Sequence, residues 1–405
     1  MLAPSRTSAP ASPRSTSPSY TLYRVERWPF FEGAPPRGWR RARRVALTAA
    51  LVALVPALVS FASYMTQPSN SSFFINAVEW LRSNGARGLV NRVENYYYSL
   101  TAPPKGGPAL KRLPGQKGAL AGTAAGHHVA VHYYLPPPIR PLTTGLPGEG
   151  VWHATFADGG SRPPVMITSF RPEPIDYPQV VVGVAWIDHT RTSVELYPGL
   201  QEPALALPNR GPEEVPMSTR SKLVATFNSG FKLADSGGGF AWGGHTYAPL
   251  QDGLGTIVGY TDGSVNVIRW SYGPHAPPNV AYARQNLPLI VSGGRPNPNL
   301  NDSAQWGATL GNQALVWRSA VGVDRYGNLI YAAGPDQGLF SLATTMIHAG
   351  AVRAMELDIN TYWTSFITYR YPGAQDPANL LVNMDRSPLR YLTPDDRDFF
   401  AVYLR

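Results

Sequence analysis

The stretch VWRSAVGVDRYGNLIYAAGPDQGLFSLATTMIHAGAVRAMELDINTYWTSF, residues 316–366, decides the fold. Two runs rich in β-branched and aromatic residues flank the turn sequence DRYGN, which predicts a β-hairpin. A helix is expected from about Leu339 to Ala349, with Gly350 placed to cap its end. The strand AVRAMELD follows and ends at Asp358. Strands thus surround a single helix, which is typical of an α+β domain.

Short β-type runs recur between turn signals over the rest of the chain. The pair GTIVGY and SVNVIRW is joined at Asp262 and Gly263, a strong hairpin signal. We therefore predict an α+β domain over 127–405, with a mostly antiparallel sheet and few helices. The other predicted strands are HVAVHYYL (128–135), VMITSF (165–170), VVVGVAWID (180–188), SVELY (193–197), KLVATFNSGF (222–231) and LPLIVSGG (287–294).

The composition excludes several classes of site. The 405 residues contain no cysteine, so disulfides, thiolate nucleophiles and cysteine-ligated zinc are ruled out. The formal net charge is +9, but five arginines (Arg37, Arg40, Arg41, Arg43 and Arg44) cluster before one apolar run. Because the basic residues elsewhere are dispersed among acids, nucleic acid is not expected as a partner.

The apolar run Val45–Met65 carries no charge and is about as long as the roughly 20 residues that span a bilayer. Its arginine-rich N-terminal side predicts a single-pass helix in the cell membrane, with a cytoplasmic N-terminus and an extracytoplasmic main domain. A cleaved signal peptide is the alternative, because Ser60 and Ala62 are small residues at a suitable spacing. The whole pattern fits a bacterial cell-envelope protein.

The predicted organisation has five parts. Residues 1–44 form a basic cytoplasmic leader that is expected to be disordered, and 45–65 form the transmembrane helix. Residues 66–100 show amphipathic spacing with a break near Asn84 and Gly85, which predicts a helical juxtamembrane stalk or helices packed on the main domain. Residues 101–126 resemble a Pro/Gly linker, and 127–405 form the domain.

Two features of the opening stretch suggest a site. An arginine inside an apolar strand, Arg318, could bind a phosphate or carboxylate, or could form a structural ion pair. Glu356 and Asp358 lie two residues apart and share one face of a strand. They could divide acid and base roles, or hold a divalent cation such as calcium. Alternatively, Asp358 could cap the chain while Glu356 pairs with an arginine such as Arg353.

Further candidates lie in neighbouring loops. FNSGF, residues 227–231, brings Asn228 and then Gly230 to a strand end, where a glycine allows close approach to a ligand. A glycine-rich loop follows and carries His245, which is either a ligand contact or a hydrogen-bonded structural residue. His127, His128 and His132 could suggest a metal site, but a solvated strand edge is favoured because no fourth ligand is evident.

In this order, FNSGF, LPLIVSGG, WRSAVGVDRYGNLIY and AMELD resemble the phosphodiester glycosidase family, the family of the uncovering-enzyme domain. The resemblance covers about residues 220–366. It implies hydrolysis of a sugar linked to a phosphodiester. It places Asn228 and Gly230 in the first motif, Arg318 and Ser319 in the second, and Asp358 in the third. It also implies that Arg318 holds the phosphate while Asp358 acts at the sugar or organises the loop.

The chain departs from that family at its glycine loop. Asp358 is followed by INTYWTS where the family has Gly-Gly-Gly-Ser, so the glycines that bring backbone N–H groups against an anion are missing. In this loop Asn360 could contact a ligand and Trp363 could stack on a sugar, or belong to the core. Two hypotheses follow: a hydrolase of sugar phosphodiesters or related envelope glycans, or a non-catalytic glycan-binding or scaffold protein.

Overall fold

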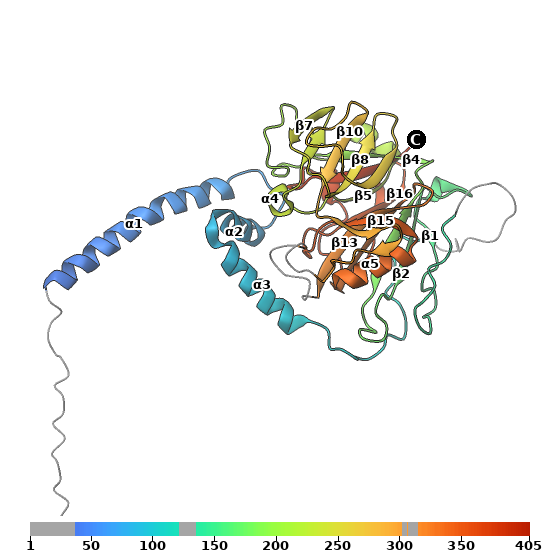
Figure 1. Cartoon of the computed structure of the whole chain (residues 1–405), viewed down its shortest axis with the longest axis horizontal. Coiled ribbons are helices and arrows are strands. Elements are labelled where there is room, and N and C mark those ends of the chain that lie inside the picture. Colours follow the sequence, from blue (N-terminus) through green and yellow to red (C-terminus); the bar gives the residue numbers. More distant parts are fainter. Residues whose placement is uncertain (1–36, 121–134, 302–305, 307–314) are drawn as a thin grey trace, which may run out of the picture. The chain divides into compact units, whose positions relative to one another are not determined.

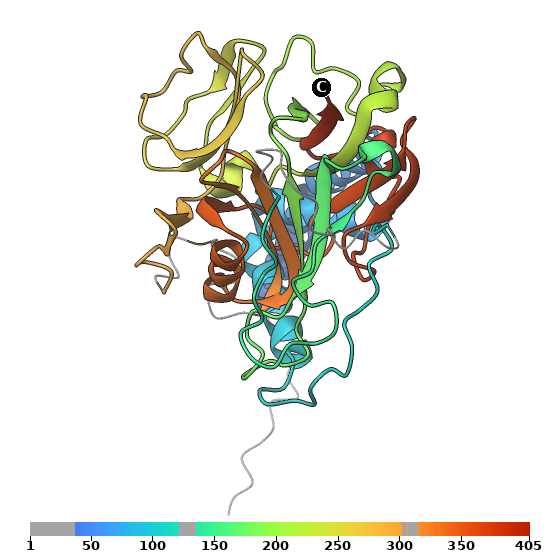
Figure 2. The same cartoon turned by 90° about the vertical axis from the view of Figure 1, so that its right-hand side faces the viewer.

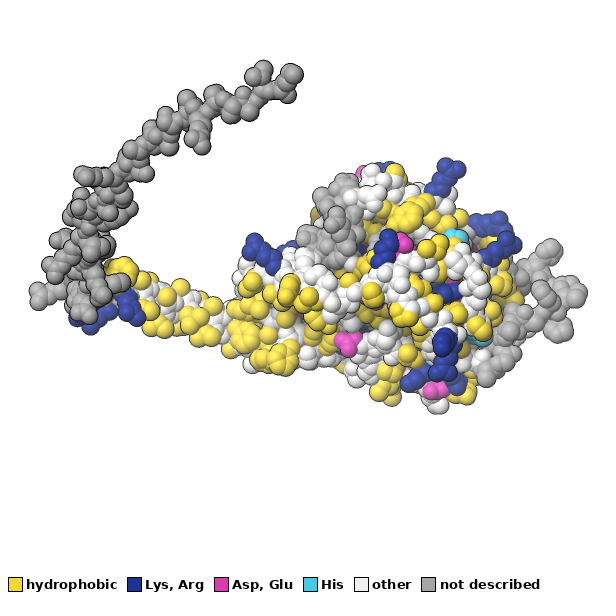
Figure 3. All heavy atoms as spheres, turned by 90° about the horizontal axis from the view of Figure 1, so that it is seen from below, with side chains coloured by type: hydrophobic (Ala, Val, Ile, Leu, Met, Phe, Trp, Pro, Cys, Tyr) yellow, Lys and Arg dark blue, Asp and Glu magenta, His cyan; other side chains and the backbone are white. Residues whose placement is uncertain are grey.

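The computed structural model describes residues 37–120, 135–301, 306 and 315–405. Its contacts divide the chain into two compact units, 1–60 and 61–405. Helix α1, Arg37–Met65, supplies the described part of the first unit and continues into the second. Its Gly38–Met65 portion is long and apolar enough to cross a membrane, compatible with an anchor or a signal sequence. In Figure 3 basic side chains lie at one end of this helix and hydrophobic ones along it.

Residues 66–101, here called the covering segment, lie near the start of the second unit. Helix α2 (Phe73–Leu81) starts at Ser72, whose hydroxyl accepts from the N–H of Ile75, and a π-helical turn (Arg82–Ala86) connects it to α3 (Arg87–Thr101). The backbone leaves helical geometry at Asn84 and Gly85, where the sequence predicts a break.

The polar side of α2 faces inward. Asn76 and Glu79 are buried, whereas Phe74, Leu89 and Tyr97 on the two helices are at least 60% exposed. Polar side chains of the covering segment therefore face the domain, together with the buried Val90 and with Tyr98, which packs against the core.

An eight-stranded sheet forms the centre of the second unit (Figure 1). Every pairing between its described strands is antiparallel. Its strand order is β1 (His153–Ala154), β2 (Val165–Phe170), β3 (Val182–Ile187), β14 (Leu329–Gln337), β13 (Val316–Asp324), β15 (Ala351–Glu356), β11 (Leu289–Ser292) and β12 (Arg295–Pro296).

Two five-stranded antiparallel sheets complete the described strands. One has the order β17 (Gln375–Asn379), β16 (Phe366–Tyr371), β5 (Leu223–Asn228), β18 (Phe399–Leu404) and β4 (Thr192–Tyr197). The other has the order β7 (His245–Ala248), β6 (Phe240–Trp242), β10 (Val280–Gln285), β8 (Gly255–Tyr260) and β9 (Val265–Arg269). Short helical pieces lie at Ala157–Gly159, Met217–Lys222, Leu233–Ser236 (α4) and Arg390–Leu392.

The central sheet is covered on both faces, so β13 is buried along its whole length. On one face, Ala320 and Ile330 pack with Leu342 of helix α5 (Leu339–His348). On the other, Val321 and Tyr331 pack with side chains of the β5-containing sheet. Alternate residues of each strand thus enter different cores, as a period of two requires. Figure 2 shows α5 against the strands from the side.

The predicted α+β class with mostly antiparallel strands is confirmed. The hairpin at Asp262 and Gly263 joins β8 to β9, and α5 ends one residue before Ala349, followed by Gly350 at φ 98°. Strand 128–135 and the start of the domain at 127 lie almost entirely outside the described residues.

Candidate functional site

The three motifs meet where β5 and β15 end beside β13. Asn228, the last residue of β5, donates from Nδ2 to the hydroxyl of Ser319 at 3.2 Å. Ser319 in turn donates from Oγ to the carbonyl of Asp358 at 3.1 Å and accepts from its N–H at 3.2 Å. The hydroxyl of Tyr331 donates to Asn228 Oδ1 at 2.9 Å. These buried bonds fix the backbone at Asp358, and they make Asn228 and Ser319 positioning residues.

Arg318 and Glu356 form an ion pair inside the protein. Arg318 Nη1 lies 2.6 Å from Glu356 Oε1, and both side chains are fully buried. The Nε of Arg318 also donates to the carbonyl of Gln337 at 2.8 Å. Arg318 therefore matches the structural ion pair that was the alternative to an anion site. The acid it meets is Glu356, whose pKa burial raises although Arg318 acts to lower it.

Asp358 takes a different direction from Glu356, although the two are only two residues apart. Strand β15 ends at Glu356, and the Asp358 side chain lines a pocket. Burial raises the pKa of Asp358 to about 6, against the opposing effect of Arg397. The carboxyl of Glu356 thus pairs with an internal arginine. The carboxyl of Asp358 faces a cavity, and its pKa of about 6 lies close to neutral pH.

The pocket lies between the domain and the covering segment. Its volume is about 50 Å³, room for a few water molecules but not for a sugar. The domain contributes Phe231, Lys232, Asp235, Leu287, Asp358, Ile359, Asn360, Trp363 and Arg397, and the covering segment contributes Glu79, Arg82, Arg87 and Glu94.

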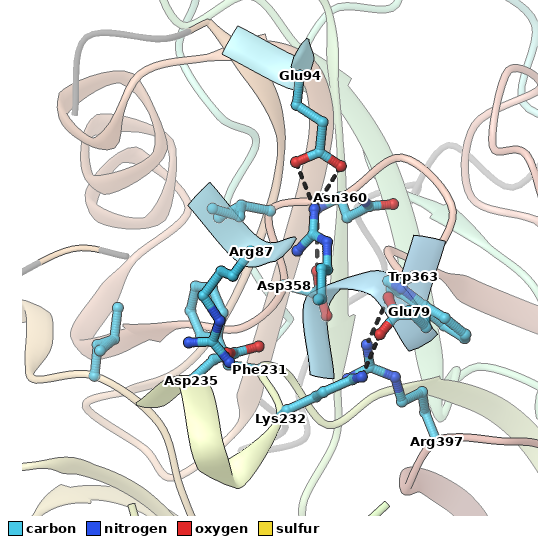
Figure 4. A pocket seen from close by; sticks show the side chains of 13 residues that line it. Glu79, Arg87, Glu94, Phe231, Lys232, Asp235, Asp358, Asn360, Trp363 and Arg397 are labelled. Carbon is cyan, nitrogen blue, oxygen red and sulfur yellow. Dashed lines mark hydrogen bonds and ion pairs between the residues drawn. The ribbon is translucent and has the colours of Figure 1, made fainter. Parts of the chain in front are cut away.

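Two cations of the pocket, Lys232 and Arg397, lie near an aromatic ring and an acid of helix α2. The Arg397 guanidinium carbon is 4.3 Å from the centre of the buried Trp363 ring, a cation–π contact. Glu79 pairs with Lys232, and its Oε1 lies 3.8 Å from Arg397 Nη2. Figure 4 shows Glu79 pointing toward both cations, next to Trp363.

The turn after β5 places Lys232 in this pocket. Gly230 has φ 120°, and a Cβ there would lie 2.3 Å from Asn286 Oδ1, so this position requires glycine. Asn286 accepts from the N–H of Phe231 at 3.0 Å, which holds the turn. Gly230 therefore allows the backbone conformation of the turn, but it is not among the pocket's lining residues.

The predicted binding residues separate into two groups. Asn360 and Trp363 line the pocket, as a ligand contact requires. His245 is exposed on β7, in a sheet that does not contribute to this pocket. Among the described residues there is no group of three or more His, Asp or Glu side chains suited to a metal ion. His127, His128 and His132 lie outside those residues, and a calcium requirement stays a prediction.

Sequence reasoning missed Lys232, Arg397 and Glu79. Lys232 directly follows FNSGF, which was a usable signal, because a motif turn also positions the residue after it. Glu79 is an acid within the apolar stretch AVEWL of a helix, which also could have indicated a buried partner. Arg397 lies in the charged run DDRD, which looks like a solvated turn.

No family model and no curated protein matches this chain. Among solved structures, the catalytic domain of zebrafish N-acetylglucosamine-1-phosphodiester alpha-N-acetylglucosaminidase, auto-inhibited by its pro-peptide, is 17% identical with a TM-score of 0.39. That match covers 63% of this chain and 88% of the zebrafish one. A hypothetical protein from Synechocystis is 15% identical with a TM-score of 0.35, over 61% of this chain and 63% of that protein's length. At these values a function has to be inferred from the site itself.

Proposed function

We propose that the protein is a membrane-anchored, extracytoplasmic glycoside hydrolase that acts on sugar phosphodiesters or related cell-envelope glycans. One observation carries this proposal. Asp358, a buried carboxyl with a pKa of about 6, lines a pocket that also holds Lys232 and Arg397. A titratable acid beside fixed positive charge suits cleavage of a bond whose leaving group is an anion.

The proposed reaction breaks the bond between the anomeric carbon of the sugar and the phosphate oxygen, and water adds to that carbon. Asp358 is mostly ionised at pH 7 and accepts a proton from the attacking water. The phosphate ester departs with the electron pair of the broken bond and is stabilised by the cations of the pocket. Trp363 and Asn360 line the pocket and would contact the sugar once the pocket is wide enough to admit it.

Five other predicted residues act indirectly in this scheme. Asn228 and Ser319 hold the backbone of Asp358, and Gly230 shapes the turn that carries Lys232. Arg318 and Glu356 form an ion pair between β13 and β15, two residues before Asp358. The proposed direct contribution to catalysis is therefore concentrated in Asp358.

A non-catalytic glycan-binding or scaffold protein is the second candidate. The observation that favours it is the burial of Arg318 against Glu356, which pairs the motif arginine with an internal acid. The loop after Asp358 also lacks the glycines of the family pattern. Such a protein would bind a glycan in the same pocket without releasing sugar.

The location is part of the proposal. Helix α1 would anchor the chain in the membrane with its arginine-rich end in the cytoplasm, and the residues after Met65 would face the cell exterior. Glycans of the envelope would then be within reach of the pocket.

Hydrolysis by the purified full-length chain of a panel of sugar 1-phosphodiesters and plain glycosides tests the proposal. Sugar release is expected from phosphodiesters, with a loss of at least about 100-fold in Asp358→Asn. Asp262→Asn, the same change in the exposed turn between β8 and β9, is the matched control. Glycan binding without sugar release from any substrate would favour the second candidate.

A further inference from the structure

Glu79 reaches the candidate site from outside the β-sheet domain. It belongs to α2, yet its nearest charged partners are Lys232, after β5, and Arg397, before β18. Its side chain is only 10% exposed. One carboxylate oxygen pairs with Lys232 and the other faces Arg397, so the two cations hold the acid from two sides.

Several polar contacts hold the covering segment over the pocket. Ser69 Oγ donates to Asp396 at 2.8 Å, and Asn70 Nδ2 donates to Asp395 at 2.9 Å. At the start of α3, Arg87 pairs with Asp235 of α4 at 2.8 Å. These contacts hold the chain on either side of α2, so that Glu79 lies in the pocket.

The energetics of this contact depend on charge more than on shape. A carboxylate taken out of water loses several kcal/mol of hydration unless cations replace it. Burial acts to raise the pKa of Glu79, but Arg397 and Lys232 outweigh burial and lower it to about 2. The same pair of cations would stabilise another oxyanion at that position, and a phosphodiester oxygen carries the same kind of charge.

We propose that Lys232 and Arg397 form the subsite for the phosphate group of the substrate, and that Glu79 occupies it as an internal competitor until α2 moves away. This inference rests on the proposed function for its choice of phosphate as the ligand. The small cavity agrees with it, because about 50 Å³ leaves no space for a sugar phosphodiester while α2 is in place.

The covering segment has a point at which α2 can separate from α3. Asn84 and Gly85 are non-helical, with Gly85 at φ 89°, so the two helices are not one rigid rod. Movement of α2 alone would withdraw Glu79 from the cations and enlarge the pocket beside Asp358.

Calorimetric titration of the full-length chain with inorganic phosphate tests this inference. Glu79→Gln keeps the side-chain size but removes the charge, and should raise phosphate affinity at least about 10-fold, because the internal competitor is weakened. Glu214→Gln, an acid-to-amide change at a residue that pairs with Arg220 outside the pocket, is the matched control and should stay within about twofold of the unmodified chain. Adding Lys232→Gln to Glu79→Gln should remove most of the gain.

Equal phosphate affinity in the unmodified chain, Glu79→Gln and the double variant would overturn the inference. If Glu79→Gln does not fold, hydrogen exchange on the unmodified chain decides: saturating phosphate should lower the protection of amides in residues 73–81, and unchanged protection contradicts the inference. Neither readout requires catalysis. A gain in phosphate affinity in Glu79→Gln without any sugar release would contradict only the proposed function. Sugar release without such a gain in affinity would contradict only this inference.

Discussion

Replacement of Arg318 by methionine separates a structural role from a ligand-binding role. In the structure Arg318 and Glu356 are both fully buried, 2.6 Å apart, and Arg318 also donates to the carbonyl of Gln337. Removing one member of a buried ion pair typically costs about 3 to 5 kcal/mol, because the remaining charge is left without compensation. We expect Arg318→Met to lower the free energy of unfolding by about that amount.

The effect of Arg318→Met should depend on pH with a defined sign. The pKa of Glu356 is already raised by burial, and loss of Arg318 raises it further. The folded state then binds a proton more tightly than the unfolded state. The stability loss should therefore be smallest below the unfolded glutamate pKa of about 4.3, and should grow as the pH rises through the folded pKa.

Urea unfolding of the full-length chain, followed by tryptophan fluorescence at pH 4.5 and pH 7.5, measures both effects. The double variant Arg318→Met with Glu356→Leu is the control, and should recover most of the loss because no charge is left buried. Unchanged stability in Arg318→Met, together with lost phosphate binding, would refute this reasoning and return Arg318 to the anion-binding role that its motif implies.

Three other predictions concern the pocket. The kcat/KM for sugar release should fall about 10-fold per pH unit below about pH 6, because Asp358 becomes protonated; a flat profile between pH 4 and pH 7 would contradict its role as base. Gly230→Ala should lower the free energy of unfolding by about 1 to 3 kcal/mol, because its Cβ would strike Asn286 at a positive φ; an unchanged melting temperature would count against this. Trp363→Leu, made in the Glu79→Gln chain, should weaken phosphate binding about 2- to 30-fold, because Arg397 of the subsite loses its contact with the ring. Titration with phosphate measures this change.

The fold was largely predictable because local signals agreed with it. Alternating apolar residues marked β13 and β14, Asp262 and Gly263 marked a tight hairpin, and Asn84 with Gly85 marked the break between α2 and α3. The order of strands within each sheet was not predictable, because pairing partners lie far apart in sequence. β5, for example, lies between β16 and β18, over a hundred residues later in the chain.

The site was predictable only in part. Asp358 and Trp363 were expected near a ligand and line the pocket, because the end of a strand opens toward a cavity. The strand pattern left Arg318 open between an anion site and a structural ion pair, and only the family resemblance implied that it holds a phosphate. Spacing could not show that its partner is Glu356. Lys232 and Arg397 line the same pocket as Asp358, and they come from turns after β5 and before β18 that are far apart in the sequence.

Release of sugar from a sugar 1-phosphodiester by the full-length Glu79→Gln chain, with and without Asp358→Asn, is the most direct test. With the competitor removed, Glu79→Gln is predicted to release sugar at least about 10-fold faster than the unmodified chain at low substrate concentration. Adding Asp358→Asn should lower that rate at least about 100-fold while phosphate still binds. Equal rates with and without Asp358→Asn, or phosphate binding with no sugar released by either chain, would contradict a hydrolase centred on Asp358.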